Sequence, residues 1–226
     1  MRDFFEINSK SVLKLYINQI AMAVFGLMVV FASAQSESLL LLASSVSVGL
    51  YLVIIYSMMW EAGAKAAAKT LRAEDAEIKK IQTPFLIILF GSLFNILCYL
   101  IYTVLKIIVD LKNITEITES SLASFGNFIW HFMRMINGIY MGFEAVLFPN
   151  PYLESAIETT AEEAVIIMYT PAYYFFLTLI PLFVIGMLAY YLGASEISIL
   201  KKLGFKVNNK YVSNTHIDYS KNKNKK

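Results

Sequence analysis

The sequence predicts an all-α, polytopic membrane protein with four transmembrane helices and an outer amphipathic or re-entrant helical cap. The chain has 226 residues, of which 58% are hydrophobic and 16% charged, whereas an ordinary soluble domain is about 45–50% apolar and about 25% charged. Its mean hydropathy is +0.59. The apolar residues gather into runs of about 20, the length that crosses a hydrocarbon core of about 30 Å. These observations exclude a disordered chain, a small disulfide-rich domain and a typical cytosolic enzyme.

Four runs qualify as transmembrane segments. Each is expected to be helical, because only a helix satisfies the backbone N–H and C=O groups of an open segment within hydrocarbon. Four residues separate the first two runs, which predicts a tight antiparallel hairpin. Pro181 in the fourth run predicts a kink, because proline removes a backbone hydrogen bond and clashes with the preceding turn. The four runs are residues 15–34, 39–59, 85–105 and 166–192.

The basic residues predict the orientation of the chain. If successive loops alternate between the two sides of the membrane, only Lys106, Lys112 and Arg134 of the 19 lysines and arginines fall on the outer side. Because these residue types are enriched on the cytoplasmic side, both termini are expected in the cytoplasm and the protein in the cell membrane. The alanine-rich inner loop 61–83 is expected to continue the second helix, and its basic residues should favour anionic lipid headgroups.

Residues 1–206 are expected to form a single integral membrane domain, with the outer cap at about 110–165. Residues 207–226 are polar and rich in lysine, which predicts a disordered cytoplasmic tail. Cys98 is the only cysteine, so no internal disulfide can form. The basic residues flank membrane segments and form no separate basic domain, so nucleic acid is not an expected partner.

Residues 125–148 are apolar enough to resemble a fifth span. A fifth crossing would put the termini on opposite sides and export either the basic loop 61–83 or the lysine-rich tail, so this segment is expected not to cross. On one helix at about 100° per residue, its polar residues form a single stripe. The stripe consists of Asn127, His131, Arg134, Asn137, Gly138 and Glu144.

Three arrangements of this stripe remain open. The helix can lie at the outer interface with its stripe toward water or headgroups, or it can pack over the mouth of the bundle and line a polar cavity. In the third arrangement the helix crosses, and Arg134 then needs a partner because a charge at that depth is costly. The candidate ligand or cavity residues are Asn18, Gln19, Asn95, His131, Arg134, Asn137 and Glu144. For the amides inside spans, the competing interpretation is a hydrogen bond between helices, worth about 0.6–2 kcal/mol.

No catalytic or metal-binding signature occurs in the sequence. GxxxxGK[ST], HExxH and GxSxG patterns are absent, as is any metal-spaced set of cysteine and histidine. The sequence therefore predicts no catalytic residue, no metal and no cofactor. The leading hypothesis is a non-enzymatic membrane subunit or accessory protein that binds a protein partner, a second copy of itself or lipid. The alternative is a small transporter or channel subunit with a polar cavity under the outer cap. An enzyme that uses His131 or Glu144 is the third hypothesis.

Three short patches resemble segments of uncharacterised small multi-pass membrane proteins of bacteria. They are residues 60–65, 134–142 and 189–193, which contain Trp60-Glu61-x-Gly63, Asn137-Gly138-x-Tyr140 and Ala189-Tyr190-Tyr191. The resemblance implies a bacterial integral membrane protein and carries no activity with it.

Overall fold

The computed structural model describes residues 2–70, 82–112, 121–148 and 170–195. Within these ranges the chain consists of helices and short connections, without a strand. Four helices are long and apolar enough to cross a membrane: Phe4–Ser33, Glu37–Ala67, Leu93–Leu111 and Ala172–Ala194. The predicted all-α class and the four candidate spans are thereby confirmed, by helix length and composition.

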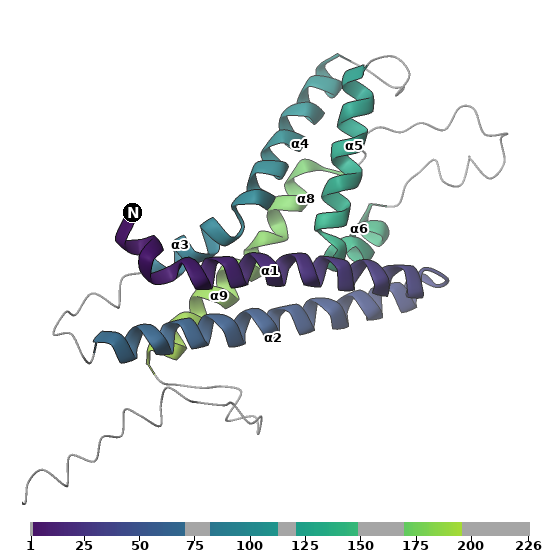
Figure 1. Ribbon diagram of the computed structural model, residues 1–226. Coiled ribbons are helices and arrows are strands. Elements are labelled where there is room, and N and C mark those ends of the chain that lie inside the picture. Colours follow the sequence, from purple (N-terminus) through teal and green to yellow (C-terminus); the bar gives the residue numbers. More distant parts are fainter. Residues whose placement is uncertain (1, 71–81, 113–120, 149–169, 196–226) are drawn as a thin grey trace, which may run out of the picture.

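The first two helices form the expected antiparallel hairpin (Figure 1). Helix α1 covers Arg2–Ser33 and α2 covers Glu37–Thr70. The Ser36 N–H donates across the connection to the Ser33 carbonyl at 3.4 Å, and the Leu40 N–H donates to the Ser36 carbonyl at 2.8 Å in the first turn of α2. Helix α1 begins well before residue 15, because its first turns also find apolar partners: Phe4 packs against the core and lies 5.9 Å from the ring of Phe90. Helix α2 continues past residue 59, as the alanine-rich loop predicted, and residues 71–81 lie outside the described part.

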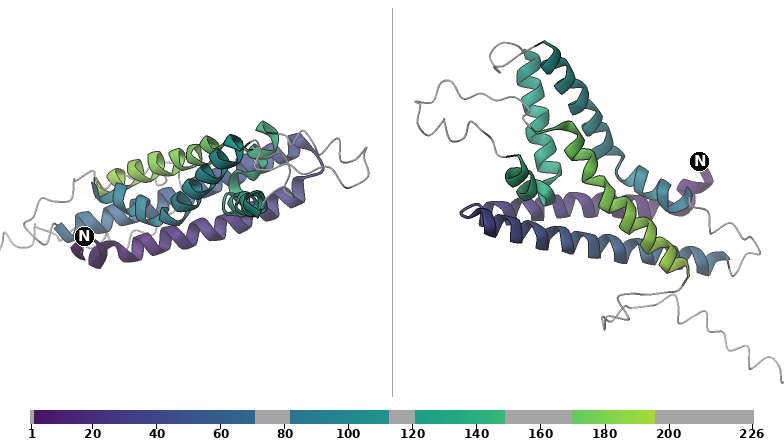
Figure 2. Two further views of the ribbon diagram at one scale, coloured as in Figure 1. Left: turned by 90° about the horizontal axis from the view of Figure 1, so that it is seen from above. Right: turned by 180° about the vertical axis from the view of Figure 1, so that it is seen from behind.

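The third predicted span, 85–105, is divided into two helices that meet at a bend (Figure 2). Helix α3 covers Gln82–Gly91 and α4 covers Leu93–Leu111, with Ser92 between them. Gly91 lets the Leu15 side chain of α1 approach the backbone at this point. Helix α4 continues beyond residue 105, the predicted end of the span, because its last turns are amphipathic. Lys106 pairs there with Asp110 at 3.7 Å, one turn further along the helix.

Residues 125–148 were expected as one helix and form three shorter elements instead. Helix α5 covers Ser121–Ile136, the 3₁₀ helix η3 covers Gly138–Tyr140 and α6 covers Met141–Leu147. The break lies where Gly138 contacts α1, because a Cβ at Gly138 would overlap the carbonyl oxygen of Ala23. Helix α5 packs against α4, whereas η3 and α6 pack against α1 and α2. Residues 113–120 and 149–165, which also belong to the predicted cap, lie outside the described part.

The last span is interrupted as Pro181 predicted. Helix α8 covers Ala172–Leu177 and α9 covers Leu179–Ala194, with Thr178 between them. Pro181 has no N–H for the carbonyl of Leu177, which is the position four residues earlier. The last described range begins at Thr170, so the predicted start of this span at residue 166 lies outside the described residues.

The buried side chains form two cores. In Figure 1, α9 passes behind α1 at an angle and packs against α2, and α4, α5 and α8 form a second arm that leaves the α1–α2 pair. Tyr140 and Leu179 pack against both cores and therefore mark their junction. The first core includes Leu15, Met22, Tyr51, Ile55, Met59, Trp60, Ile87, Ile88, Leu182 and Tyr190. The second includes Tyr99, Tyr102, Leu105, Val109, Trp130, Met133, Tyr174 and Phe175.

Reciprocal glycines allow a close backbone contact between α2 and α9. A Cβ at Gly63 would overlap the backbone oxygen of Tyr190, and a Cβ at Gly193 would overlap that of Trp60. Small residues that let backbones approach are typical of helix interfaces in membranes. Two of the three sequence patches noted above therefore contact each other.

Candidate functional site

Three helix interruptions gather polar side chains at the junction of the two cores. The interruptions are at Ser92, at Asn137 and at Thr178. In a membrane span, backbone groups released by a break need side-chain or water partners. The side chains that meet here come from α1, α4, the α5–η3 corner and the α8–α9 corner.

The first cluster joins α1 to the α3–α4 break. Gln19 is buried, and its amide nitrogen donates to the Ser92 hydroxyl at 2.8 Å. The amide nitrogen of Asn95 donates to Gln19 Oε1 at 3.0 Å. Two of the predicted site residues are therefore brought together, in a hydrogen-bonded pair between helices. Asn18, which neighbours Gln19, points elsewhere: its amide contacts the Met58 sulfur at 3.7 Å.

The second cluster joins the α5–η3 corner to α4 and to the α8–α9 break. Asn137 is 5% exposed. Its Oδ1 accepts hydrogen bonds from the Tyr99 hydroxyl at 2.7 Å and from Thr178 at 3.2 Å. Its Nδ2 donates to the Met133 carbonyl at 3.0 Å. The amide thereby holds three elements together.

A small polar cavity lies between these two clusters. Its volume is about 20 Å³, close to the space that one water molecule needs. Residues from both cores line it: Gln19, Tyr51, Asn95, Tyr99, Ile136, Asn137, Ile139, Tyr140, Thr178, Leu179 and Leu182. The wall of the cavity is partly polar, but the cavity is far smaller than the roughly 300–1,000 Å³ of a typical small-molecule site.

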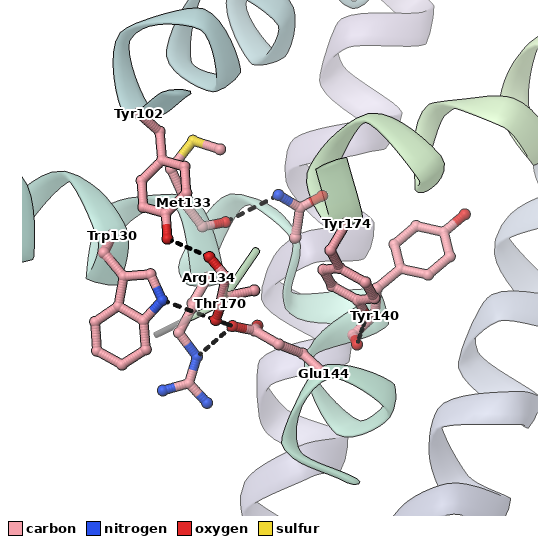
Figure 3. A network of polar contacts seen from close by, with 9 residues as sticks. Tyr102, Trp130, Met133, Arg134, Tyr140, Glu144, Thr170 and Tyr174 are labelled. Atoms are coloured by element: carbon pink, nitrogen blue, oxygen red, sulfur yellow. Dashed lines mark hydrogen bonds and ion pairs between the residues drawn. The ribbon is translucent and has the colours of Figure 1, made fainter. Parts of the chain in front are cut away.

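A third cluster surrounds Thr170, and Figure 3 shows it from close by. The Thr170 hydroxyl donates to Glu144 Oε1 at 2.6 Å and accepts from the Trp130 indole N–H at 3.0 Å. The Tyr102 hydroxyl donates to the Thr170 carbonyl at 2.6 Å. Arg134 Nε lies 3.3 Å from Glu144 Oε1, and its guanidinium carbon lies 4.9 Å from the centroid of the Trp130 ring.

The charges in this cluster are unequally buried. The Glu144 side chain is 0% exposed and the Arg134 side chain 17%. Burial raises the pKa of the Glu144 carboxyl above its ordinary value, while Arg134 and Thr170 act in the opposite direction. Glu144 Oε2 has no hydrogen-bond partner among the described residues. In Figure 3 the two terminal nitrogens of Arg134 point away from Glu144.

The polar stripe predicted on residues 125–148 is thus divided. Arg134, Asn137 and Glu144 turn inward, so this part of the stripe does not face water. His131 remains exposed on α5, and partial burial together with the Arg134 charge lowers its pKa. The break at Asn137 changes the direction of Glu144 relative to the α5 residues, whereas the prediction placed all six residues on one continuous helix. Asn127 also remains on α5, with its Oδ1 buried and without a partner among the described residues.

An apolar groove lies between α1 and the α4–α5 pair. Its volume is about 250 Å³. Gln19 and Asn95 form part of its wall and also line the polar cavity, so their hydrogen-bonded pair separates the two spaces. The other lining residues are Tyr16, Ile20, Ala23, Val24, Leu27, Phe94, Phe132, Met135 and Ile136.

The sequence did not indicate several residues of these clusters. Thr170 precedes Pro171 inside the predicted fourth span, and Tyr99 and Tyr102 lie in an apolar helix, in which tyrosine is common. Their hydroxyls are recognisable only once the fold brings Asn137 and Thr170 beside them. Within the described residues, no group of three or more histidine, cysteine or acidic side chains could hold a metal.

The chain matches no protein-family model, and neither a curated protein nor a solved structure matches it.

Proposed function

We propose that this chain is a non-enzymatic integral protein of the cell membrane that binds a lipid acyl chain in the groove between α1 and the α4–α5 pair. The groove is the observation that supports this proposal. It is lined mainly by apolar side chains, and Ile20, Val24 and Met135 at its rim are 49%, 47% and 56% exposed. In a bilayer, side chains exposed on a candidate span face lipid, and Ile20 and Val24 lie on such a span, α1. The groove therefore opens toward acyl chains.

The size of the groove favours a lipid acyl chain as the occupant over a helix of a partner protein. An engineered apolar cavity of about 150 Å³ accepts benzene, so a groove of about 250 Å³ has room for a longer, flexible hydrocarbon segment. One turn of helix with side chains, about 10 Å across and 5.4 Å high, fills about 400 Å³. A partner helix could insert only side-chain ends, and the groove would stay partly unfilled.

The test compares two tryptophan substitutions at equal depth. Val24 lies nine residues before the end of α1 at Ser33, and Val46 lies nine residues after the start of α2 at Glu37. Both are about half exposed, at 47% and 55%, but only Val24 lines the groove. Val24→Trp should fill the groove, whereas Val46→Trp should add the same side chain to an open lipid-facing surface.

The measurement is native mass spectrometry of protein released from nanodiscs. We expect the wild type and Val46→Trp to retain one phospholipid that Val24→Trp loses. Equal retention by all three proteins would contradict acyl-chain binding in the groove. A protein that co-purifies with the wild type and is lost from Val24→Trp would make the occupant a protein partner and would also contradict the proposal.

For the orientation, we propose that both termini are cytoplasmic. The start of α1 and the ends of α2 and α9 lie at the same end of the molecule (Figures 1 and 2). At that end Glu61 pairs with Lys14 at 3.1 Å and with Lys65 at 2.6 Å, and basic residues there would favour the anionic inner leaflet. A cysteine replacing Lys10 should react with an impermeant thiol reagent only after the cells are opened; reaction in intact cells would contradict this orientation.

One observation favours the second candidate, a small transporter or channel subunit. Interrupted helices around a polar cavity are a recurrent feature of transporter binding sites, and Thr178 and Asn137 belong to such interruptions. A Thr178→Cys variant on a Cys98→Ser background separates the candidates. An impermeant thiol reagent should leave Thr178→Cys unmodified if the protein binds lipid only, whereas modification in the membrane would identify a water-filled path and favour transport.

A further inference from the structure

The Tyr140 hydroxyl is buried and has no hydrogen-bond partner among the described residues. The carbonyl of the same residue is satisfied, because it accepts a hydrogen bond of 2.8 Å from the Tyr174 hydroxyl. Buried hydroxyls are almost always paired with protein or with ordered water. Tyr140 is one of the residues that line the polar cavity at the junction of the two cores, so a partner for its hydroxyl can lie there.

Two other residues that line the cavity, Gln19 and Asn95, offer acceptors. Asn95 uses its amide nitrogen to donate to Gln19 Oε1, and its own Oδ1 remains as an acceptor. Gln19 Oε1 has a second lone pair beyond the one that Asn95 occupies. The cavity of about 20 Å³ is large enough for one water molecule, since a buried water needs roughly 10–15 Å³ of such space and two to four polar partners.

We propose that this cavity is a binding site for one water molecule, which accepts a hydrogen bond from Tyr140 and donates to the amide oxygens of Asn95 and Gln19. The water would connect η3 with α1 and α4, across the junction at which the three helices are interrupted. It would also place a polar partner directly behind the Gln19–Asn95 pair, on the side away from the apolar groove. This site is independent of the proposed lipid binding.

The chemistry of the lining favours water over a cation. Among the residues that the structure describes, no carboxylate lines the cavity, so none of them compensates a positive charge there. Asn137 Oδ1, the remaining amide oxygen of the wall, already accepts hydrogen bonds from Tyr99 and Thr178. The unsatisfied group is a hydroxyl that needs an acceptor, and a cation provides none.

The test uses the sign of a stability change. If a water is bound, Tyr140→Phe removes one of its hydrogen bonds and should lower Tm by about 2–4 °C in a chain of this size. Tyr191→Phe is the matched control, because the Tyr191 hydroxyl is also buried and unpartnered among the described residues but lines neither cavity nor groove. The Tm of the Tyr191→Phe variant should equal or exceed that of the wild type.

Two outcomes would overturn the proposal. An unchanged or increased Tm for Tyr140→Phe would mean that the hydroxyl has no bound partner to lose. A Tm of the wild type that rises in Na⁺ relative to choline, with no such rise in Tyr140→Phe, would identify a cation instead. Independently, a cryo-EM or crystal map at about 2 Å should show one isolated density peak within hydrogen-bond distance of Tyr140 and Asn95. Elongated density that continues past Gln19 into the groove would be the polar end of a lipid and would overturn the water site.

Discussion

The buried pair of Arg134 and Glu144 should respond asymmetrically to removal of either charge. Glu144 is 0% exposed, whereas Arg134 is 17% exposed and directs its terminal nitrogens away from the pair. Arg134→Met leaves a carboxylate buried without its cation, a change that costs about 3–5 kcal/mol in other proteins. Glu144→Gln leaves a cation that can still reach a polar environment, and the new amide oxygen can still accept from Thr170. We expect that variant to lose only about 1–2 kcal/mol.

The two costs should not be additive. In the double variant neither charge remains, so the penalty of an unpaired carboxylate disappears. The double variant should therefore be at least about 1 kcal/mol more stable than the sum of the single changes predicts. Lowering the pH should also reduce the cost of Arg134→Met, because a protonated Glu144 needs no cation.

The measurement is the free energy of unfolding from SDS titration in mixed micelles. His131→Ala provides the control on the same helix, because His131 is exposed and no hydrogen bond or ion pair of it occurs among the described residues; its effect should stay within about 0.5 kcal/mol. The reasoning is refuted if Glu144→Gln costs as much as Arg134→Met, or if the two costs are additive.

Three further predictions use the same measurement. Gly63→Ala and Gly193→Ala should each lower the stability by about 1–3 kcal/mol, because the added Cβ meets backbone; Gly49→Ala, which has open space around it, should leave the stability unchanged or raise it, and equal effects would contradict the close contact. Because burial raises the pKa of Glu144, the folded protein binds this proton more tightly than the unfolded chain, so the stability should fall as the pH rises from the ordinary carboxyl pKa through the raised one; Glu144→Gln should flatten this dependence, and an unchanged slope would count against it. Gln19→Leu removes two hydrogen bonds between helices and should cost about 1–3 kcal/mol, and a neutral effect would show that neither bond is stabilising.

The positions of the helices could be predicted from the sequence because apolar length decides them. The interruptions of the helices were harder to predict from the sequence, except for the one near Pro181. Pro181 predicts a break through a covalent property of one residue, whereas the breaks at Ser92 and Asn137 depend on contacts with α1. Ser92 accepts from Gln19, and Gly138 next to Asn137 fits against Ala23. The mean hydropathy over a window of about 20 residues changes little at a single polar residue, so the predicted span extends across the break.

The candidate site was predicted in part for the same reason. Residue type and depth pointed to Gln19 and Asn95, and the structure pairs them. The partners of Glu144 could not be predicted for two reasons. The direction of Glu144 depends on the break at Asn137, and its partner Thr170 lies 26 residues further along the chain. A helical stripe states which residues share a face of one helix. It does not show which of these residues still share a face once the helix is interrupted.

The way the polar groups are used bears on function. Gln19, Asn95 and Asn137 all bond to other parts of the same chain, and Glu144 is held by Arg134 and Thr170. These hydrogen bonds stabilise the junction between the two cores, and the acceptor sites that Gln19 and Asn95 have left line a cavity with room for one water molecule but not for a larger ligand. The surface that remains for binding is therefore the apolar one, where desolvation costs nothing and a hydrocarbon chain loses no hydrogen bond on entry. That difference in cost is the physical reason to place binding in the groove and to treat the polar interior as the element that keeps the groove open.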